Sequence, residues 1–276
     1  MIEAFKKSLM AIAKKPHILV PAIALALVMA FAFSSLFMSA SDTLTEFALE
    51  NRALNLGFFE MTIAFYKAYW TDVLFFTMVM AFLAWLNTAS LLFYSKAAMH
   101  YEEKDSLSTA LKYTLKNYWK ALALVVFLFL LGFLAAIFFF LAALFSPIGV
   151  EAMAILLFGL VVIFAIIFIR LFAFAVPAMV FEEADVRESI SLSWQFSGKK
   201  FPETIILILV AFFCSAVITS TGLALLQFAS KDISLIISAV FNSLIFAFTS
   251  MLFAFYYFDN PGIVTKKARH QRKRKK

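Results

Sequence analysis

The sequence predicts an all-α integral membrane protein with six transmembrane helices, and three observations indicate this fold class. First, 64% of the 276 residues are hydrophobic and the mean hydropathy is +0.93, whereas soluble domains are about 45–50% apolar. Second, the chain contains six apolar runs of about 20 residues or more, the length that crosses a bilayer as a helix. Third, these runs are continuously apolar and lack the alternation that a transmembrane β-barrel needs.

The six predicted spans follow one another along the chain with connections of different length. They run over about 17–40, 73–98, 119–145, 150–176, 204–228 and 233–258. Tight turns at 146–149 and 227–232 join the third span to the fourth and the fifth to the sixth. The first run is longer than the apolar core of a signal peptide, so we interpret it as a retained helix. Cys214 is the only cysteine, which excludes an intrachain disulfide and a thiolate metal cluster.

Positive charge is distributed unevenly between the two sides of these spans. Lysine and arginine are frequent before the first span, in the second and fourth connections, and after the sixth span. The opposite connections are mainly acidic. Because short loops rich in lysine and arginine stay in the cytoplasm, we expect a cell-membrane protein with both termini cytoplasmic. The net charge of +7 follows from the same asymmetry, so we expect no nucleic-acid partner.

A short motif, Met-x-aromatic-Glu-Glu-x-Asp, occurs at 99–105 and again at 179–185. The residues that follow each copy align without gaps with the N-terminus, MIEAFKKSLMAIAKK. The aligned sets are Ala4, Ala110 and Ser189; Phe5, Leu111 and Ile190; Ser8, Thr114 and Ser193; Leu9, Leu115 and Trp194; and Lys14, Lys120 and Lys199. We predict three parallel repeats over about 1–98, 99–178 and 179–258, within a single domain of residues 1–262. Chance similarity between segments of biased composition is the alternative.

Each aligned segment has a helical pattern, with apolar residues four positions apart and small residues beside them. The apolar stripes are Met1, Phe5 and Leu9; Leu107, Leu111 and Leu115; and Val186, Ile190 and Trp194. The small stripes are Ala4 and Ser8; Ala110 and Thr114; and Ser189 and Ser193. We predict an amphipathic helix at the cytoplasmic interface before the first, third and fifth spans. Small residues let helices approach closely in membranes, so these stripes are expected to be packing faces.

The acidic residues of the motif are interpreted as structural. Asp185 is a suitable N-cap and Glu188, three residues later, completes a capping box. Asp105 is expected to start its helix in the same way, and the preceding glutamates favour the positive helix end. The residues predicted to act as caps or ion-pair partners are Glu102, Glu103, Asp105, Glu182, Glu183, Asp185 and Glu188. The alternative is acid–base catalysis by paired carboxylates, which needs a reaction partner and a dry cleft.

The same region resembles a known family. Arg170-Leu171, the phenylalanine-rich run to Pro177, and VFEEADVRESISLSW are similar to the membrane domain fused in bacteria to glycerophosphodiester phosphodiesterases, and to related uncharacterised stand-alone multi-pass proteins. The resemblance covers the fourth and fifth spans and the helix between them. It implies a helical membrane module with interfacial helices. It does not imply phosphodiesterase activity, because that chemistry belongs to a separate soluble barrel, and no segment here is long or polar enough to form one.

Arg170 is the strongest single candidate for a functional residue, because it lies inside the fourth span, about 10 Å along the helix from Pro177. Charges at membrane depth are costly and usually pair or line a path. We expect contact with a lipid or substrate phosphate; the alternatives are snorkelling to the inner interface or an ion pair with Glu103 or Glu182. Further candidates for lipid or substrate contact are Lys14, Lys120, Lys199 and Lys200.

No catalytic residue, cofactor or metal site is predicted. The three histidines are scattered, and no nucleophile, nucleotide or metal motif is present. Polar residues inside the spans are expected to line a cavity or to bond within and between helices. They are Asn87, Thr88 and Ser90; Ser215, Thr219, Ser220 and Thr221; and Asn242, Ser243, Thr249 and Ser250. Pro177 is expected to kink the fourth span.

Two further segments are candidates for interactions. The outer segment 41–72 is predicted to form a helical cap, or alternatively a docking site for a protein partner. The tail 263–276 is predicted to be disordered and cytoplasmic, and its polybasic run favours anionic lipid headgroups.

These observations predict a non-catalytic multi-pass membrane protein that organises lipid or a partner protein at the inner leaflet. A transporter or flippase for a lipid or small solute is the alternative, since repeats are common in transporters. An intramembrane enzyme has the least support from the sequence.

Overall fold

The computed structural model describes residues 1–29, 47, 58–103, 105–144, 150–226 and 231–260. Over these residues the regular elements are all helices. Five of them are long and apolar enough to cross a membrane, over Lys67–Met99, Tyr118–Phe138, Phe158–Phe181, Phe201–Gly222 and Ile236–Asp259. Ile2–Lys14 and Pro16–Met29 meet at a bend of 100° and raise the number to six if the pair is one span. The prediction of an all-helical membrane protein is therefore confirmed.

The helices follow one another with short connections. Their bounds are α1 Ile2–Lys14, the 3-10 helix η1 Pro16–Leu19, α3 Phe58–Met99, α4 Ser106–Lys116, α5 Tyr118–Leu144, α6 Val150–Phe172, α7 Ala175–Phe181, α8 Val186–Lys199, α9 Phe201–Leu226 and α10 Lys231–Asp259. The predicted tail 263–276 lies outside the described residues, and so do the second half of the first predicted span and most of the segment 41–57.

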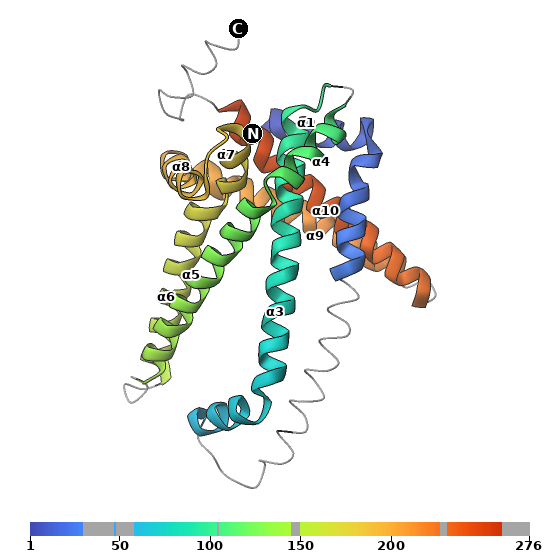
Figure 1. Ribbon diagram of the computed structural model, residues 1–276. Helices are drawn as coiled ribbons and strands as arrows, with labels where there is room; N and C mark the ends of the chain where they lie inside the picture. Colours follow the sequence, from blue (N-terminus) through green and yellow to red (C-terminus); the bar gives the residue numbers. More distant parts are fainter. Residues whose placement is uncertain (30–46, 48–57, 104, 145–149, 227–230, 261–276) are drawn as a thin grey trace.

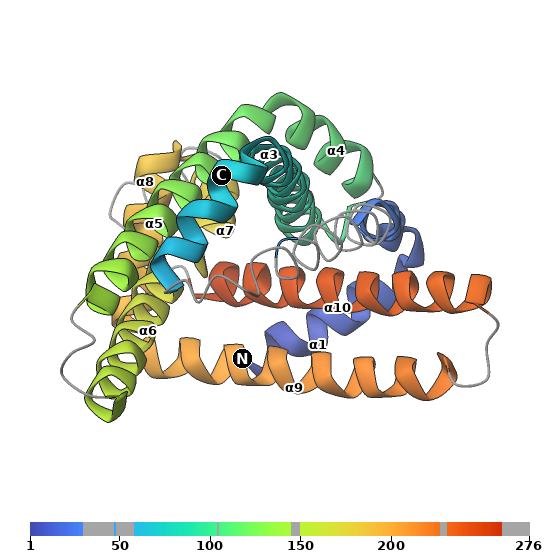
Figure 2. The same cartoon turned by 90° about the horizontal axis from the view of Figure 1, so that it is seen from below.

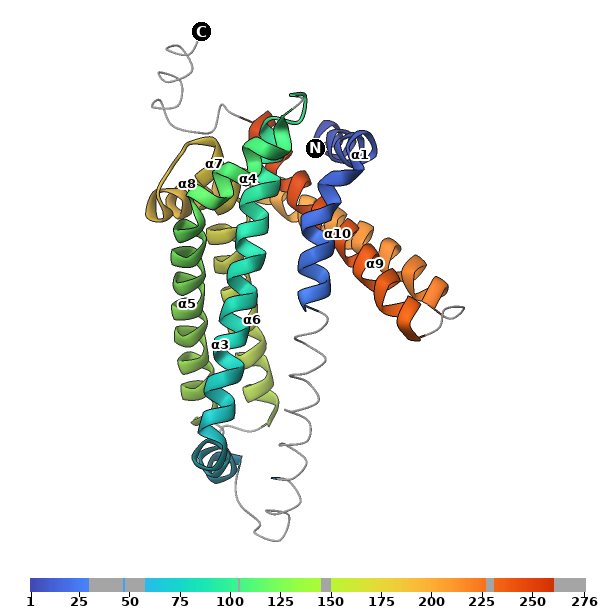
Figure 3. The ribbon, with the colours of Figure 1, turned by 45° about the vertical axis from the view of Figure 1, so that its right-hand side comes forward.

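The long helices form a bundle from which one hairpin leans away. Helix α5 packs against α3 and α6, whereas α9 and α10 lie along each other and diverge from that group (Figure 3). Seen from below, α9 and α10 are side by side over most of their length (Figure 2). Helix α10 also contacts α1, α3 and α7, so it joins the hairpin to the remainder of the bundle. The short helices α1, α4, α7 and α8 gather at one end of the molecule (Figure 1).

Helix α3 is longer than the predicted second span of 73–98. It begins at Phe58, within the predicted outer cap, and its backbone leaves helical geometry at Tyr69 (φ −121°, ψ 29°). The described part of the cap is therefore helical and continues into the span through a kink. The ring of Phe47 lies edge-on to that of Tyr69, with centroids 6.1 Å apart.

The fourth predicted span, 150–176, is broken rather than continuous. Helix α6 ends at Phe172 and α7 begins at Ala175, with Phe174 in a non-helical conformation (φ −122°, ψ 8°). Pro177 explains the position of the break, because proline has no N–H and its ring clashes with the carbonyl four residues earlier, that of Ala173. The expected kink is thus a break that begins one turn before the proline.

A serine of α8 is inserted into the broken backbone. In a continuous helix the Phe174 N–H would donate to the Arg170 carbonyl. Here the Phe174 N–H donates to Ser193 Oγ at 3.1 Å, and Ser193 Oγ donates to the Arg170 carbonyl at 3.1 Å. Ser197 Oγ lies 3.0 Å from the same carbonyl. The hydroxyls of α8 therefore satisfy the backbone groups that the break releases.

The three short helices before the spans bury small residues. Their buried sets are Ala4, Ser8 and Ala11 in α1; Ser106 and Ala110 in α4; and Ser189, Leu192, Ser193, Phe196 and Ser197 in α8. By contrast, Leu9, Leu111 and Leu115 of the apolar stripes are exposed on the outside. The small side chains thus bring these helices close to the bundle, and the larger apolar ones face away from it.

An aromatic cluster fills the core at the end where the short helices gather. The ring of Phe174 lies 4.6 Å from that of Phe196 and about equally far, 6.0 Å, from those of Tyr256 and Tyr257, measured between centroids. All four side chains are buried. The cluster joins the broken span, α8 and the end of α10.

The two predicted N-caps behave differently. Asp185 has the extended backbone of a capping residue (φ −76°, ψ 176°), and its Oδ1 accepts a hydrogen bond from the Glu188 N–H at 2.8 Å. Asp105 occupies the same position before α4, but its side chain makes no capping bond. Its backbone (φ −95°, ψ 22°) lies outside the extended region that capping requires, so this part of the prediction is wrong. The reverse bond of a capping box, from the Glu188 carboxylate to the Asp185 N–H, is not present either among the described residues.

We expect Asp185→Ala to lower the free energy of unfolding by about 1 kcal/mol, because the Glu188 N–H loses its acceptor. Asp105→Ala removes the same carboxylate from a site without a capping bond, so its effect should stay within about 0.5 kcal/mol. Thermal unfolding of the two variants in mild detergent measures the difference. Equal effects would contradict the assignment of the cap.

Candidate functional site

Arg170 lies in the last turn of α6, and its side chain crosses to α8. Its guanidinium stacks on the ring of Trp194, with Cζ 3.8 Å from the ring centroid. None of the ion pairs within the described part of the chain involves Arg170, so the expected pairing with Glu103 or Glu182 is wrong. Stacking on an aromatic face compensates part of the cost of a charge at this depth.

Gly198 makes room for this guanidinium. A Cβ atom at Gly198 would lie 2.4 Å from Arg170 Nη2, which is too close for any real contact. Trp194 and Gly198 are four residues apart on α8, so they present one face to Arg170. The sequence analysis did not assign a role to Gly198, and the spacing of these two residues is the signal that was available.

One donor of Arg170 has no acceptor. Nε is buried and makes no hydrogen bond to the described protein atoms. Buried polar groups normally have a partner, and a guanidinium has five N–H donors and no acceptor atom. The arrangement of a held cation with an unused donor is suited to an anion such as a phosphate.

The four candidate lysines divide into two kinds. Lys14 and Lys199 are exposed at the ends of α1 and α8. Lys120 instead donates to the Ala184 carbonyl at 3.0 Å, and Lys200 lies 2.5 Å from Glu203 Oε1. The last two therefore already have partners within the protein, which the sequence did not predict.

Lys15 was not among the predicted candidates and has a structural role. Its Nζ donates to the Glu103 carbonyl at 2.6 Å and to Ser106 Oγ at 3.0 Å. Lys15 thus connects the end of α1 to the start of α4, as Lys120 connects α5 to the linker before α8. Both lysines donate to a carbonyl of a Glu-Glu-x-Asp linker.

The acids of the two linkers do not converge on one site. Glu102 accepts from the Tyr101 hydroxyl at 2.7 Å, and this bond raises the pKa of Tyr101. Glu103 pairs with His100 Nδ1 at 2.8 Å, whereas Glu183 is exposed with a positive φ of 55°. Within the described residues, no group of three or more histidine, cysteine or acidic side chains is placed to hold a metal.

Tyr113 of α4 lies between the second linker and α3. Burial raises its pKa to about 12, and the nearby charge of Glu183 adds to the shift. The Lys96 ammonium lies 4.8 Å from the centroid of the Tyr113 ring. Tyr113 is therefore a neutral packing residue that receives a cation on its face.

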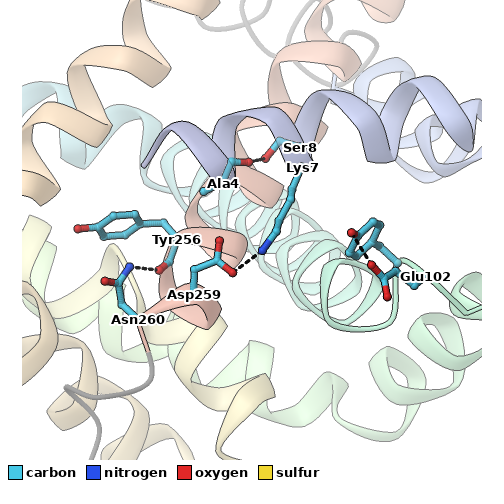
Figure 4. A network of polar contacts seen from close by, with 8 residues as sticks. Ala4, Lys7, Ser8, Glu102, Tyr256, Asp259 and Asn260 are labelled. Atoms are coloured by element: carbon cyan, nitrogen blue, oxygen red, sulfur yellow. Dashed lines mark hydrogen bonds and ion pairs between the residues drawn. The ribbon is translucent and has the colours of Figure 1, made fainter.

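A second set of contacts joins the first helix to the last. Lys7 Nζ of α1 lies 2.6 Å from Asp259 Oδ1 at the end of α10 (Figure 4). The Asn260 side chain donates to the Tyr256 carbonyl at 2.8 Å, which closes the end of the same helix. The Tyr256 hydroxyl in turn donates to Glu203 at the start of α9. The two ends of the described chain thus lie together beside α1.

A groove of about 470 Å³ lies between α3, the broken span, α9 and α10. It is lined by polar residues of two of the three predicted clusters, namely Asn87 on α3 and Thr249 and Ser250 on α10, together with Ser95. The third cluster does not reach it: Thr219, Ser220 and Thr221 are exposed on α9. The expected cavity therefore exists, but α9 contributes Ile208 to it instead of hydroxyl groups.

No protein-family model, no curated protein and no solved structure matches this chain. The resemblance to the membrane domain of glycerophosphodiester phosphodiesterases therefore stays a prediction.

Proposed function

We propose that this protein is a non-catalytic membrane module that binds anionic lipid at the leaflet beside α1, α4 and α8. One observation carries the proposal: Arg170 is held on Trp194 at the broken span, has no acidic partner among the described residues, and keeps a buried donor unused. A lipid phosphate supplies both the charge and the acceptor that this arrangement requires. Trp194 is partly exposed beside it, as expected for a residue at a membrane interface.

The proposal extends to the architecture. In it the chain consists of three units, each an interfacial helix followed by two spans. The small buried faces of α1, α4 and α8 support this view, as do the outward leucines of α1 and α4. The contacts of Lys15 and Lys120 with successive linkers also support it, because each fastens one unit to the next at a similar position.

The proposed orientation places both termini in the cytoplasm of the cell. In a Cys214→Ser background, a cysteine at Lys199 should react with a membrane-impermeant maleimide only from the cytoplasmic side. A cysteine at Trp70, which is exposed near the other end of α3, should react only from outside. Reaction of both from the same side would overturn the topology.

Removal of the Arg170 guanidinium should weaken the binding of anionic lipid. We expect Arg170→Ala to lower the phosphatidylglycerol retained by the purified protein about tenfold, the loss typical of a charge-assisted hydrogen bond. Arg170→Lys keeps the charge but loses the planar donor set, so an intermediate loss is expected. Native mass spectrometry with phosphatidylglycerol and phosphatidylcholine measures the retained lipid.

Two further variants separate a built site from bulk charge. Gly198→Ala preserves every charge but displaces the guanidinium from α8, so it should also lower retention; it should not weaken α8, because alanine favours a helix over glycine. Lys112→Ala removes one exposed positive charge elsewhere and should leave retention unchanged. If Lys112→Ala has the same effect as Arg170→Ala, the lipid senses net charge only and the proposed site is wrong.

Transport of a lipid is the second candidate function, favoured by the groove beside the broken span. Broken helices near the membrane centre are typical of transporters. A leaflet-exchange assay on vesicles with labelled lipid distinguishes the two functions. Exchange that depends on Arg170 would favour transport, whereas retained lipid without exchange supports the binding module.

A further inference from the structure

The groove between α3, the broken span and the last hairpin is placed to receive a molecule from the bilayer. All its lining residues belong to membrane-spanning helices. It is not enclosed, and it opens to the surface of the bundle. Its volume of about 470 Å³ is that of a small-molecule site, and most of its lining is apolar, with a few polar groups, as binding sites usually are.

Two polar side chains in this groove lack a partner. Asn87, Leu91 and Ser95 lie four residues apart on α3 and form one stripe along the groove. Neither the Asn87 amide nor the Ser95 hydroxyl makes a hydrogen bond within the described residues, although Ser95 is only 2% exposed. Polar side chains in an apolar environment are costly when they are unpaired, so these two groups favour a ligand that bonds to them.

The opposite wall adds hydrogen-bond acceptors. Thr249 Oγ1 and Ser250 Oγ donate to carbonyls of their own helix, at 2.8 Å to Ile245 and 2.5 Å to Phe246. A hydroxyl that donates in this way keeps lone pairs free to accept. Together with the Asn87 amide, the groove thus offers both donors and acceptors.

The groove contains no charged side chain in its described lining. Arg170 is close in sequence to Ile169 and Ala173, which line the groove, but its guanidinium faces α8. A charged headgroup would therefore lose its hydration in the groove without compensation. An uncharged hydroxyl or ester group would be satisfied by the polar stripe.

The depth of the polar groups agrees with such a ligand. Ser95 lies about 6 Å and Asn87 about 18 Å along the helix from the end of α3. A lipid with a phosphate headgroup is anchored at the interface and does not bring its polar part to the deeper position. A lipid without one is able to do so.

We infer that this groove binds a neutral glycerolipid, one whose polar part is an uncharged hydroxyl or ester, with that group on Asn87 and Ser95 and an acyl chain along the apolar walls. This is a site distinct from the proposed anion site at Arg170, because the two lie on different faces of α6. It remains valid if Arg170 binds no anion.

Photolabelling of the intact protein tests the inference. The protein is reconstituted in phosphatidylcholine vesicles that contain a diacylglycerol with a photoactivatable acyl chain, and labelled peptides are identified by mass spectrometry. A phosphatidylcholine with the same photoactivatable chain is the control for general lipid access. We expect the diacylglycerol to label 87–95 and 246–253 about fivefold more than the control lipid does, the preference that one hydrogen bond provides.

Variants test the polar stripe itself. Asn87→Leu combined with Ser95→Ala should lower diacylglycerol labelling of the groove about fivefold. Asn242→Leu combined with Ser220→Ala makes the same changes at exposed positions on the last hairpin and should leave it unchanged. If the groove double variant does not purify as a folded protein, Ile208→Trp fills the groove from α9 and should give the same loss. Arg170→Ala should not alter this labelling.

Three results would overturn the inference. They are equal labelling by both lipids, labelling that survives in Asn87→Leu/Ser95→Ala or Ile208→Trp, and loss of labelling in Arg170→Ala. The last would mean that the groove belongs to the anion site.

Discussion

Ser193→Leu is expected to lower the free energy of unfolding by about 3–5 kcal/mol, which is enough to prevent recovery of folded protein. Two effects add. The leucine side chain has no room at a position where Ser193 is fully buried against the broken span, and overpacking of this kind costs about 1–3 kcal/mol. The Phe174 N–H and the Arg170 carbonyl also lose the hydroxyl between them, and a buried polar group without a partner costs about 1–3 kcal/mol.

The matched control for this variant is Ser191→Leu. Ser191 is two residues away on the exposed side of α8, so the same substitution there should change stability by less than about 0.5 kcal/mol. Ser193→Ala separates the two effects, because it removes the hydroxyl without adding volume. Fluorescence-detected size exclusion and thermal unfolding in detergent provide the readout. A Ser193→Leu protein as stable as Ser191→Leu would mean that the small face of α8 is not a packing face.

Phe174→Ala is expected to destabilise the protein by about 3–5 kcal/mol, the range for truncation of a fully buried phenylalanine. Phe174 is the residue at which the fourth span is broken, and its ring contacts those of Phe196, Tyr256 and Tyr257. Truncation leaves a cavity between α8 and α10 and removes the dispersion contacts of all three neighbours. Because this cluster connects the broken span to the last helix, the leaning hairpin should lose its attachment first.

Limited proteolysis measures both consequences of Phe174→Ala. Cleavage near the start of α9 should become faster than in the wild type, and the unfolding temperature should fall. Phe212→Ala is the control, because Phe212 is 72% exposed on α9 and has few protein contacts to lose. Equal stability of the two variants would show that the aromatic cluster does not hold the hairpin.

The broken span illustrates what sequence patterns predict well and what they do not. Pro177 indicates a distortion, since it removes a donor and displaces a carbonyl whatever the surroundings are. The residues that satisfy the released groups come from α8, sixteen or more positions further along the chain. No local pattern links Ser193 to Arg170, because a serine at that spacing serves equally well as a small packing residue.

The caps show the same limit at shorter range. Asp105 and Asp185 occupy equivalent positions in the motif, yet only Asp185 has the backbone angles that bring its carboxylate to the helix N–H groups. The linker before α4 is held by Lys15, which donates to the Glu103 carbonyl, whereas the linker before α8 is held by Lys120 at Ala184. A motif records residue types, whereas the capping bond depends on dihedral angles that distant contacts determine.

By itself the sequence determined the membrane-spanning helical class and the approximate position of the spans, because the length and continuity of apolar runs act through the bilayer and need no tertiary partner. It also singled out Arg170, since a charge at membrane depth is exceptional in any fold. Only the tertiary structure decided that Arg170 stacks on Trp194 over Gly198 instead of pairing with an acid, and that Asn87 and Ser95 share a groove with Thr249 and Ser250. The physical reason is that hydropathy is a property of each segment, whereas stacking, bond insertion and groove lining depend on which helix faces are turned toward each other.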